Sequence, residues 1–307
     1  MTKTNYQLFN KNASTIIYLS KLFMQMDIGS RVPTFEILSK KIGVARGTIQ
    51  NSLKILQDDR VIEITPRGHM GTFLVNKDTK KLVQMADIRT LLGAMSLPYS
   101  KTYEGLATGI ITSLHNKYDI PVNMAYMREA LSRIDALLEG YYDFIIIGKS
   151  SALEAIERGQ EIEIVIDFGE KTYLSGHLLI FSQPEYTKIE DGMRVGIAQD
   201  AIEQVRRAEE VCEGKNVEFV VMNYDEILPA LKRKDVEVTI WNKDEINDAL
   251  MQMYTVPTSS PKNVTSATLV VDKKRPELIQ LFNEIIDIEV VKTIQEKVIS
   301  GEIKPKY

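Results

Sequence analysis

The chain has 307 residues, of which 44% are hydrophobic and 26% charged, an ordinary composition for a soluble globular protein of two or three domains. No apolar run approaches the roughly 18 residues of a membrane span, there is no signal-peptide pattern, and the single cysteine, Cys212, excludes an internal disulfide. We therefore expect a cytoplasmic protein in which Cys212 is a small buried hydrophobe, and the three scattered histidines lack metal-ligand spacing.

The net charge of −4 conceals an asymmetry along the chain. Residues 1–76 hold ten of the 38 Lys and Arg residues and five of the 42 Asp and Glu residues, a net charge of +5. The other 28 basic and 37 acidic residues give the rest of the chain a net charge of −9. A basic head on an acidic body favours contact with nucleic acid at the head and not elsewhere.

Three helices are predicted in the head. The first has apolar residues at positions 16, 19, 23 and 26, and the second has them at 35, 38 and 42, after Thr34, whose hydroxyl can cap it. Gly43 and Val44 break this pattern, and a third helix follows with apolar residues at 49, 53 and 56. Residues 61–65 then alternate with a period of two, PRGHMG forms a turn and TFLV a return strand. This order predicts a winged helix-turn-helix.

The third helix has the side chains that read DNA. Arg46, Gln50 and Lys54 recur every fourth residue and so share one face, which can enter the major groove. Arginine can bond guanine with two hydrogen bonds, and Gln50 and Asn51 have the donor–acceptor pairs that suit adenine. The hairpin tip at 67–69 can contact phosphates or the minor groove. The alternative is a small helical core with a solvated charged face.

The segments VPTFEILSKKIGVARGTIQNSL and GHMGTFLV resemble the DNA-binding domain of the GntR family of bacterial transcription regulators. The resemblance covers the first quarter of the chain and implies that Arg46 reads a base, that Thr48 contacts a phosphate, and that His69 and Gly71 form the wing tip. The sequence departs from the family at Glu36, Ala45, Gln50 and Arg60, so we expect a different operator. The candidate DNA-binding residues are Arg31, Thr34, Arg46, Gly47, Thr48, Gln50, Asn51, Lys54, Arg67, His69 and Gly71.

Residues 77–96 are expected to form a linker, in which residues 82, 85, 88 and 92 have helical spacing and could face either a partner or the body. From residue 97 onward, helical and strand patterns alternate, which predicts an α/β body with mainly parallel sheets. The predicted helices are 103–117, 127–138, 151–159, 200–213, 225–232, 244–251, 275–285 and 288–300. The predicted strands are 121–125, 143–147, 163–167, 178–181, 194–198, 217–221, 236–240 and 267–271.

The body is expected to have two lobes. The first runs from about residue 97 to 180, FSQPEYTKIEDGMRVGIAQD looks like the crossover, and the last helices return to the first lobe. The segments LPYSKTYEGLATGI, VNMAYMREALSRIDALLEGYYDFIIIGKSSA and IEDGMRVGIAQDA resemble type 2 periplasmic-binding-protein-like domains, as used for effector sensing. Head and body together resemble YhfZ-type regulators. The predicted domains are therefore a DNA-binding head at 1–76, a linker at 77–96 and an effector-binding domain at 97–307.

A ligand in such a fold binds beyond the carboxyl ends of the strands, against helix N-termini that suit an anion. The candidate ligand-binding residues at these positions are Ser100, Tyr103, Arg128, Ser150, Ser151, Gln199, Trp241 and Asn242. Serine and asparagine there can equally be ordinary helix caps, and Trp241 can be core. Neither GxGxxG nor GxxxxGK[ST] occurs, and we expect no cofactor.

These patterns predict a homodimeric regulator that binds double-stranded DNA and responds to a small anionic metabolite. The competing hypothesis is an α/β enzyme that acts on a small metabolite and whose DNA-binding head regulates its own operon. Ser150 and Ser151 lie at a strand-to-helix turn but lack the GxSxG elbow, and no acidic pair is marked for acid–base chemistry. We therefore expect no catalytic residues.

Overall fold

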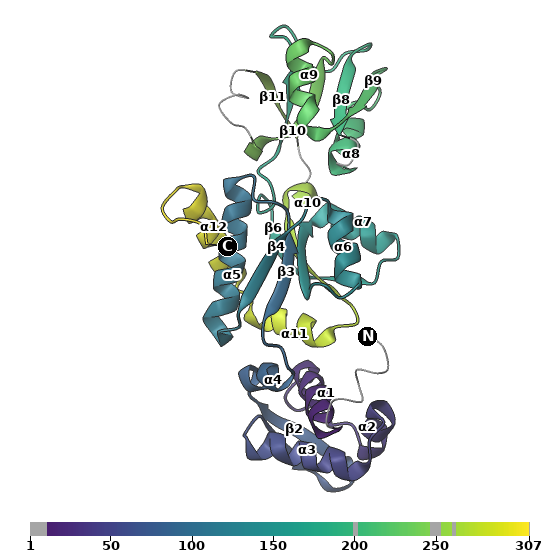
Figure 1. Cartoon of the computed structure of the whole chain (residues 1–307), viewed down its shortest axis with the longest axis vertical. Coiled ribbons are helices and arrows are strands. Elements are labelled where there is room, and N and C mark those ends of the chain that lie inside the picture. Colours follow the sequence, from purple (N-terminus) through teal and green to yellow (C-terminus); the bar gives the residue numbers. More distant parts are fainter. Residues whose placement is uncertain (1–10, 199–201, 246–252, 260–261, 307) are drawn as a thin grey trace. The chain divides into compact units, whose positions relative to one another are not determined.

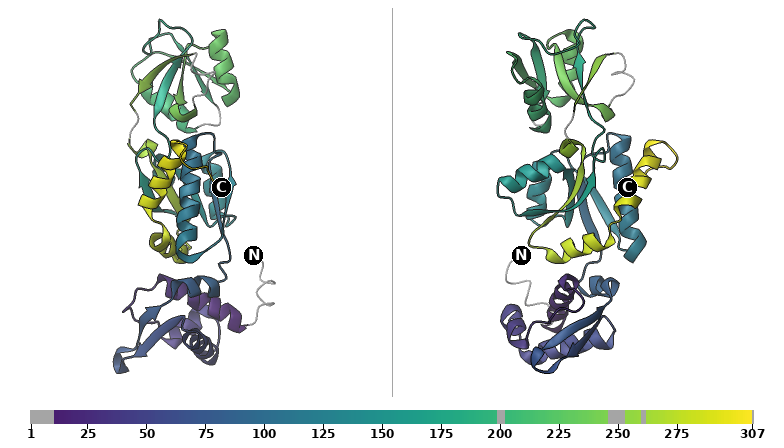
Figure 2. Two further views of the ribbon diagram at one scale, coloured as in Figure 1. Left: turned by 90° about the vertical axis from the view of Figure 1, so that its left-hand side faces the viewer. Right: turned by 180° about the vertical axis from the view of Figure 1, so that it is seen from behind.

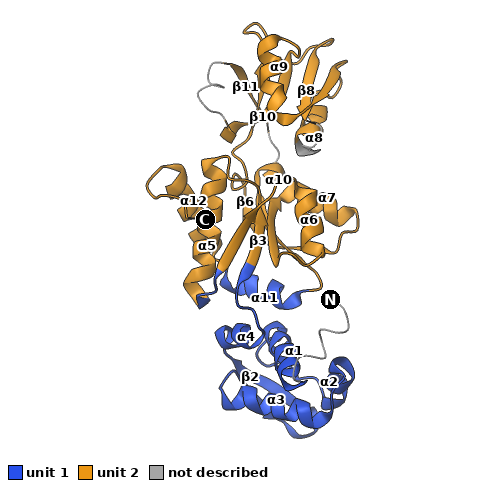
Figure 3. Cartoon of the chain, viewed as in Figure 1, with its two compact units in different colours: residues 1–91, 118–121, 275–285 blue, residues 92–117, 122–274, 286–307 orange. Residues whose placement is uncertain are grey.

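The computed structural model describes residues 11–198, 202–245, 253–259 and 262–306 (Figure 1). The chain divides into two compact units (Figure 3). Unit 1 contains residues 1–91, 118–121 and 275–285, and unit 2 contains residues 92–117, 122–274 and 286–307. Within the described ranges, no helix combines the length and the apolar content needed to cross a membrane.

Unit 1 contains the predicted winged helix-turn-helix. Its helices are α1 (Lys11–Gln25), α2 (Phe35–Ile42), α3 (Arg46–Asp58), α4 (Thr79–Met85) and α11 (Pro276–Ile285). Strands β1 (Ile62–Pro66) and β2 (Thr72–Lys77) form an antiparallel hairpin around a short turn at Gly68–Met70. The apolar residues that predicted the three helices of the head form its core, as Leu19, Phe23, Leu38, Ile49 and Leu56 are all almost fully buried.

Local capping explains the turn between α2 and α3. The Thr34 hydroxyl accepts a hydrogen bond from the Ile37 backbone N–H at 3.4 Å, as the sequence predicted for an N-cap. Gly43 ends α2 with a φ of 75°, a left-handed conformation that glycine adopts without a steric cost. Ala45 precedes α3 and provides no side-chain cap. The start of α3 therefore depends on packing against α1 and α2 more than on its own cap.

Helix α11 belongs to unit 1, although it lies near the end of the sequence. The Lys21 ammonium in α1 lies 3.6 Å from the Glu277 carboxylate of α11, and the Thr79 hydroxyl donates to Glu284 at 3.2 Å. The expectation that the last helices return to the first lobe therefore holds for α12 (Ile288–Ile299) and is wrong for α11. Sequence periodicity identified the helix, but only tertiary contacts decide which of the two units it belongs to.

The first lobe of unit 2 is built on a sheet in the order β4-β3-β5-β12-β6. Figures 1 and 2 show helices α5 and α12 on one side of this sheet and helices α6 and α7 on the other. The strands are β3 (Leu91–Met95), β4 (Val122–Tyr126), β5 (Phe144–Gly148), β6 (Ile162–Gly169) and β12 (Ala267–Asp272). The helices are α5 (Lys101–Tyr118), α6 (Ala130–Leu138), α7 (Lys149–Glu157), α10 (Lys262–Thr265) and α12.

The second lobe of unit 2 is built on a sheet in the order β11-β7-β10-β8-β9. Its strands are β7 (His177–Phe181), β8 (Arg194–Ala198), β9 (Glu218–Met222), β10 (Val238–Asn242) and β11 (Tyr254–Thr258), and its helices are α8 (Ile202–Val211) and α9 (Ile227–Arg233). Short 3-10 turns follow β9 at Tyr224–Glu226 and β10 at Lys243–Glu245. Cys212 lies in the apolar core of this lobe, where burial raises the pKa of its thiol, in agreement with the structural role predicted for it.

Both sheets are mixed, which corrects the expectation of mainly parallel pairing. Strand β12 is antiparallel to β5 and β6, and β7 is antiparallel to β10 and β11. The reason is topological. The chain leaves the first lobe after β6 and returns to it before β12, so the outgoing and returning strands run in opposite directions.

The stretch at 77–96 contains more regular structure than a linker. It holds helix α4 and strand β3, the second strand of the first sheet, and the boundary between the two units follows Leu91. Strand β11 had no counterpart among the predicted strands. The helix predicted at 244–251 lies mostly outside the described residues, and the structure describes only the turn at Lys243–Glu245.

Candidate functional site

Helix α3 is two-sided. Ile49, Ser52, Leu53 and Leu56 are buried, while the candidate DNA-binding side chains on the other side are open to solvent. The exposed candidates on this helix are Arg46, Gly47, Gln50, Asn51 and Lys54, with Thr48 half-buried. Hydrogen-bond donors and acceptors on an exposed helix face are the groups that can reach base edges in the major groove.

Two arginines of the head stack on aromatic rings. The guanidinium of Arg46 lies 4.9 Å from the ring centroid of Phe35, so it bridges the two helices of the helix-turn-helix. The guanidinium of Arg67 lies 4.7 Å from the ring centroid of Phe73 in the wing. Stacking of this kind holds a guanidinium in place while leaving its N–H groups available.

The wing is attached to the turn that precedes α2. Val32 donates its backbone N–H to Thr72 at 2.8 Å, and Gly29 donates to Leu74 at 2.8 Å, so this segment runs beside β2 like a third strand. The Arg31 guanidinium lies against Gly71, while Arg67 and His69 are exposed at the tip. The structure therefore places Arg31, Arg67, His69 and Gly71 together. Thr34 is used as a cap, and the DNA-contacting roles of all eleven residues stay predictions.

In the first lobe, the candidate ligand-binding residues lie where strands lead into helices. The Ser100 hydroxyl accepts a hydrogen bond from the Tyr103 N–H at 3.3 Å, so Ser100 caps α5 and both residues are buried. Arg128 is exposed, with its guanidinium 5.9 Å from the ring centroid of Tyr99. At the start of α7, Ser150 is buried and Ser151 is half-buried.

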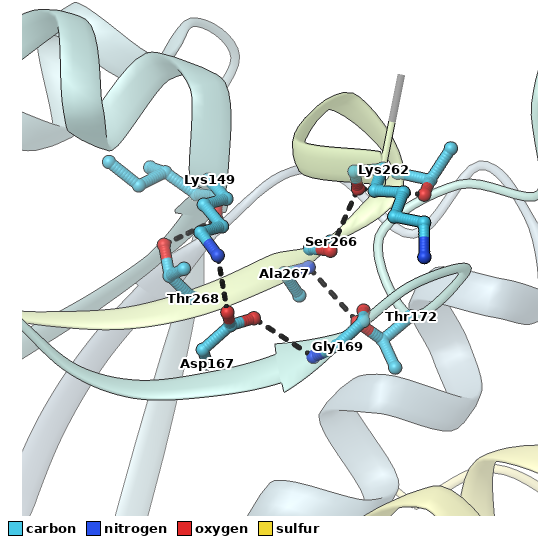
Figure 4. Close-up of polar contacts among 10 residues, drawn as sticks. Lys149, Asp167, Gly169, Thr172, Lys262, Ser266, Ala267 and Thr268 are labelled. Atoms are coloured by element: carbon cyan, nitrogen blue, oxygen red, sulfur yellow. Dashed lines mark hydrogen bonds and ion pairs between the residues drawn. The ribbon is translucent and has the colours of Figure 1, made fainter. Parts of the chain in front are cut away.

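Polar contacts that the sequence did not predict surround the start of α7 (Figure 4). Lys149 forms an ion pair with Asp167 at 2.7 Å, and the other oxygen of Asp167 accepts the Gly169 N–H at 3.0 Å. The Thr172 hydroxyl accepts the Ala267 N–H at 3.0 Å. The ion pair joins the start of α7, at the carboxyl end of β5, to β6, and the Thr172 bond joins the segment after β6 to the start of β12. The lysine charge at this helix start is therefore already neutralised.

In the second lobe, Trp241 is almost fully buried and stacks on Tyr224, with ring centroids 4.4 Å apart. Its indole Nε1 is buried and has no hydrogen-bond partner among the residues that the structure describes. The Tyr224 hydroxyl donates to Glu245 at 2.5 Å, and Asn242 donates to the same carboxylate at 3.3 Å. Burial raises the pKa of Glu245. Trp241 and Asn242 therefore lie together, and Gln199, the remaining candidate, lies outside the described residues.

Sequence reasoning overlooked Arg133 as a site residue. It lies on the inner face of α6 and is 1% exposed. Its guanidinium donates to the Met127 carbonyl and to the Tyr173 hydroxyl, the latter at 3.3 Å, while its Nε has no partner within the described part of the chain. The available signal was an arginine one helical turn before Leu137 on the apolar face of an amphipathic helix.

The architecture is that of a helix-turn-helix region followed by a two-sheet α/β domain whose fold resembles that of periplasmic-binding proteins. Residues 27–74 match a family described as a helix-turn-helix domain, and residues 78–307 match the YhfZ C-terminal domain. The chain therefore belongs to the family defined by the YhfZ C-terminal domain. The helix-turn-helix match indicates a DNA-binding regulator, while membership of the GntR family stays a prediction.

Known relatives support this assignment. The uncharacterized protein YhfZ of Escherichia coli (strain K12) is 29% identical over 301 residues, 97% of this chain and 98% of that protein. The crystal structure of YhfZ from Shigella flexneri superposes with a TM-score of 0.63 at 29% identity, covering 74% of this chain and 97% of that one. An ancestral arginine-binding protein superposes with a TM-score of 0.50 at 17% identity, covering 69% and 97%, which is a likeness of fold alone.

Proposed function

We propose that the protein is a sequence-specific transcriptional regulator of the GntR type that works in the cytoplasm as a homodimer. The observation that carries this proposal is the exposed polar and basic face of α3 opposite a mainly apolar buried face. The net charge of +5 over residues 1–76 supports it, because cationic side chains at the head favour contact with phosphates. A dimer would read a near-palindromic operator with half-sites about one helical turn apart.

The C-terminal domain is proposed to bind a small anionic metabolite between its two lobes. The mixed α/β lobes and the helix N-termini at their strand ends support this role, since such termini attract negative charge. Binding would shift the population of domain conformations, and thereby the fraction of dimers whose heads can span both half-sites. This coupling requires the ligand to have different affinities for the two conformations.

The test is selection of binding sites from random duplex DNA at a fixed ionic strength of about 0.15 M, because phosphate contacts depend on salt. The wild-type protein is expected to enrich a near-palindromic sequence. Arg46→Ala is expected to lose about 1–3 kcal/mol of discrimination at one base position. The control is Arg89→Ala, which removes an exposed arginine outside the helix-turn-helix.

Two outcomes would contradict the proposal in different ways. Unchanged discrimination by Arg46→Ala would reject the role of that side chain in reading a base. Absence of any enriched sequence, with the head shown to be folded by circular dichroism, would reject the regulator itself. Steady turnover of a metabolite by the purified protein would instead favour an enzyme.

A further inference from the structure

The first lobe contains two guanidinium groups without a carboxylate partner, both close to the ends of its strands. Arg133 is buried at 1% exposure and Arg128 is exposed, and within the described residues neither forms an ion pair. In contrast, Lys149 at the start of α7 is neutralised by Asp167. A buried cation that lacks a counter-charge is costly, and it creates a positive potential that favours an anion nearby.

The charge of Arg133 is connected to Ser96 through Tyr173. The guanidinium Nη2 donates to the Tyr173 hydroxyl oxygen at 3.3 Å, and that oxygen lies 3.1 Å from the Ser96 hydroxyl oxygen. Tyr173 is 5% exposed, and its ring is held edge-on against Tyr103 with centroids 5.2 Å apart. The three polar groups therefore form a chain from the interior of the lobe towards the end of β3.

The direction of the hydrogen bonds in this chain follows from the chemistry of its first member. A guanidinium can only donate, so the Tyr173 oxygen accepts from Arg133. The buried Tyr173 proton needs an acceptor, and within the described chain the Ser96 oxygen is the one within reach. Ser96 then accepts from Tyr173, and its own O–H remains to donate elsewhere. A half-buried hydroxyl held as a donor by a cation is suited to an acceptor with negative charge.

The position of Ser96 is one where this kind of fold binds ligands. Ser96 directly follows β3, which pairs in parallel with β5, so its hydroxyl is at the same sheet edge as the start of α7. The loop that begins at Ser96 also carries Tyr99, over which the exposed guanidinium of Arg128 lies at 5.9 Å. A polarised donor and a second unpaired cation thus belong to neighbouring loops.

We propose that Ser96 and Arg128 form an anion-binding subsite for a carboxylate or phosphate group, with Arg133 and Tyr173 as positioning residues that direct the Ser96 hydroxyl outward. The proposal rests on the effector-binding role proposed above and gives the ligand its chemical class. It also gives the two arginines different roles, which sequence alone does not distinguish. Arg128 contacts the anion, and Arg133 acts through Tyr173.

The experiment is isothermal titration calorimetry on the full-length protein with three probes: inorganic phosphate, succinate and the neutral succinamide. The wild type is expected to bind at least one of the two anions and not the amide. Ser96→Ala and Tyr173→Phe are each expected to weaken that binding by about 10-fold, the usual contribution of a hydrogen bond to a charged group. Ser132→Ala, which changes an exposed serine on α6, is the matched control and is expected to bind as the wild type does.

The controls also separate folding from binding. Ser96 is half-buried and Tyr173→Phe keeps the ring that packs on Tyr103, so both variants should melt as cooperatively as the wild type by circular dichroism. If phosphate bound to the basic head instead, every variant would bind it with nearly the same affinity as the wild type. The dependence on Ser96 therefore identifies the subsite.

Three outcomes would overturn the proposal: equal binding of succinamide, unchanged anion binding by both variants, or no binding of any probe by the wild type. None of these affects the selection of an operator from random DNA, which uses the head. An enriched operator together with one of these outcomes would retain the regulator and reject the anion subsite. Failure of both experiments would reject the proposed function as a whole.

Discussion

The hydroxyl of Tyr118, the last residue of α5, donates a hydrogen bond to the carboxylate of Glu284 in α11, 166 residues further along the chain. The same carboxylate accepts from Thr79 at the start of α4. The ammonium of Lys77 donates to three backbone carbonyls at the end of α1, and the charge of Glu284 partly offsets the lowering of the Lys77 pKa by burial. Glu284 thus connects α11 with the start of α4 and with the last residue of α5.

Tyr118→Phe is expected to weaken the attachment of α11 by about 1 kcal/mol, because it removes the hydrogen bond from the Tyr118 hydroxyl to the Glu284 carboxylate. The measurement is hydrogen exchange of the α11 amides, which should lose protection, with Tyr141→Phe, an exposed tyrosine, as the control. Folding raises the pKa of Tyr118 from 10.0 to about 12 through burial and this bond, so the contribution is present below pH 10 and is lost as the pH rises through 12. Unchanged protection in the variant would show that α11 is held by its apolar face alone.

His177, at the start of β7, should make the second lobe sensitive to acid. Burial, together with the positive charge of Arg207 and against a smaller opposite effect of Glu210, lowers the pKa of His177 from 6.5 to about 4. The folded state therefore disfavours protonation of His177. Its contribution to the free energy of unfolding is fully present above pH 6.5 and is lost as the pH falls towards 4, by up to about 3 kcal/mol.

The variant His177→Gln is expected to remove this part of the pH dependence. Urea unfolding would be measured at a pH near neutrality and at about pH 4, and the difference in unfolding free energy should be smaller in the variant than in the wild type. His115→Gln, an exposed histidine in α5, is the control and should keep the wild-type difference. An equal difference in His177→Gln would assign the acid sensitivity to carboxylates instead.

Helices α5 and α12 approach each other closely at Gly109. A Cβ added there would lie 2.7 Å from the backbone oxygen of Val291, which cannot move without shifting α12. Gly109→Ala is therefore expected to destabilise the first lobe by about 1–3 kcal/mol, the usual effect of overpacking a core. Gly47→Ala, where the structure leaves open space, should instead leave stability unchanged or raise it by up to about 1 kcal/mol. Urea unfolding of both variants tests the contrast, and an equal stability of Gly109→Ala would mean that the helices separate at little cost.

Sequence periodicity was sufficient to predict most helices and strands, because the spacing of apolar residues within each element defines its buried face. Runs such as residues 144–148 are buried throughout, as a strand covered on both faces should be. Strand β3 was missed because LLGAM has little β-propensity, and its Gly93 is explained only by Phe144, whose ring atom Cζ would lie 2.3 Å from an added Cβ. A contact between residues 51 positions apart leaves no local pattern.

The candidate sites differ in how far local sequence could define them. The candidate DNA-binding face of α3 follows directly from helical spacing, because exposure alternates with burial along one helix. The proposed anion subsite depends on a hydrogen-bond chain through Ser96, Tyr173 and Arg133, which come from three separate parts of the chain. Their hydrogen-bond chain follows from tertiary packing, so sequence reasoning chose Arg128, the arginine nearest a strand end, and overlooked Arg133.

The wing should contribute affinity without specificity. Arg67 is exposed beside the turn at Gly68–Met70, with its guanidinium held over Phe73 at 4.7 Å. If it contacts a phosphate, Arg67→Ala should weaken binding to operator and random DNA by the same factor, and the slope of log affinity against log salt should become less negative by about 0.9. Fluorescence anisotropy at several salt concentrations measures both quantities.

Arg89→Ala, which removes the same charge from a side chain that pairs with Asp87, is the control and should leave the slope unchanged. A loss of affinity confined to the operator would instead mean that Arg67 reads a base, as minor-groove arginines do in narrow A·T-rich DNA. The two results differ in their salt dependence as well, because an interaction with a base edge releases fewer counterions than one with a phosphate. The wing would then help to define the operator together with α3.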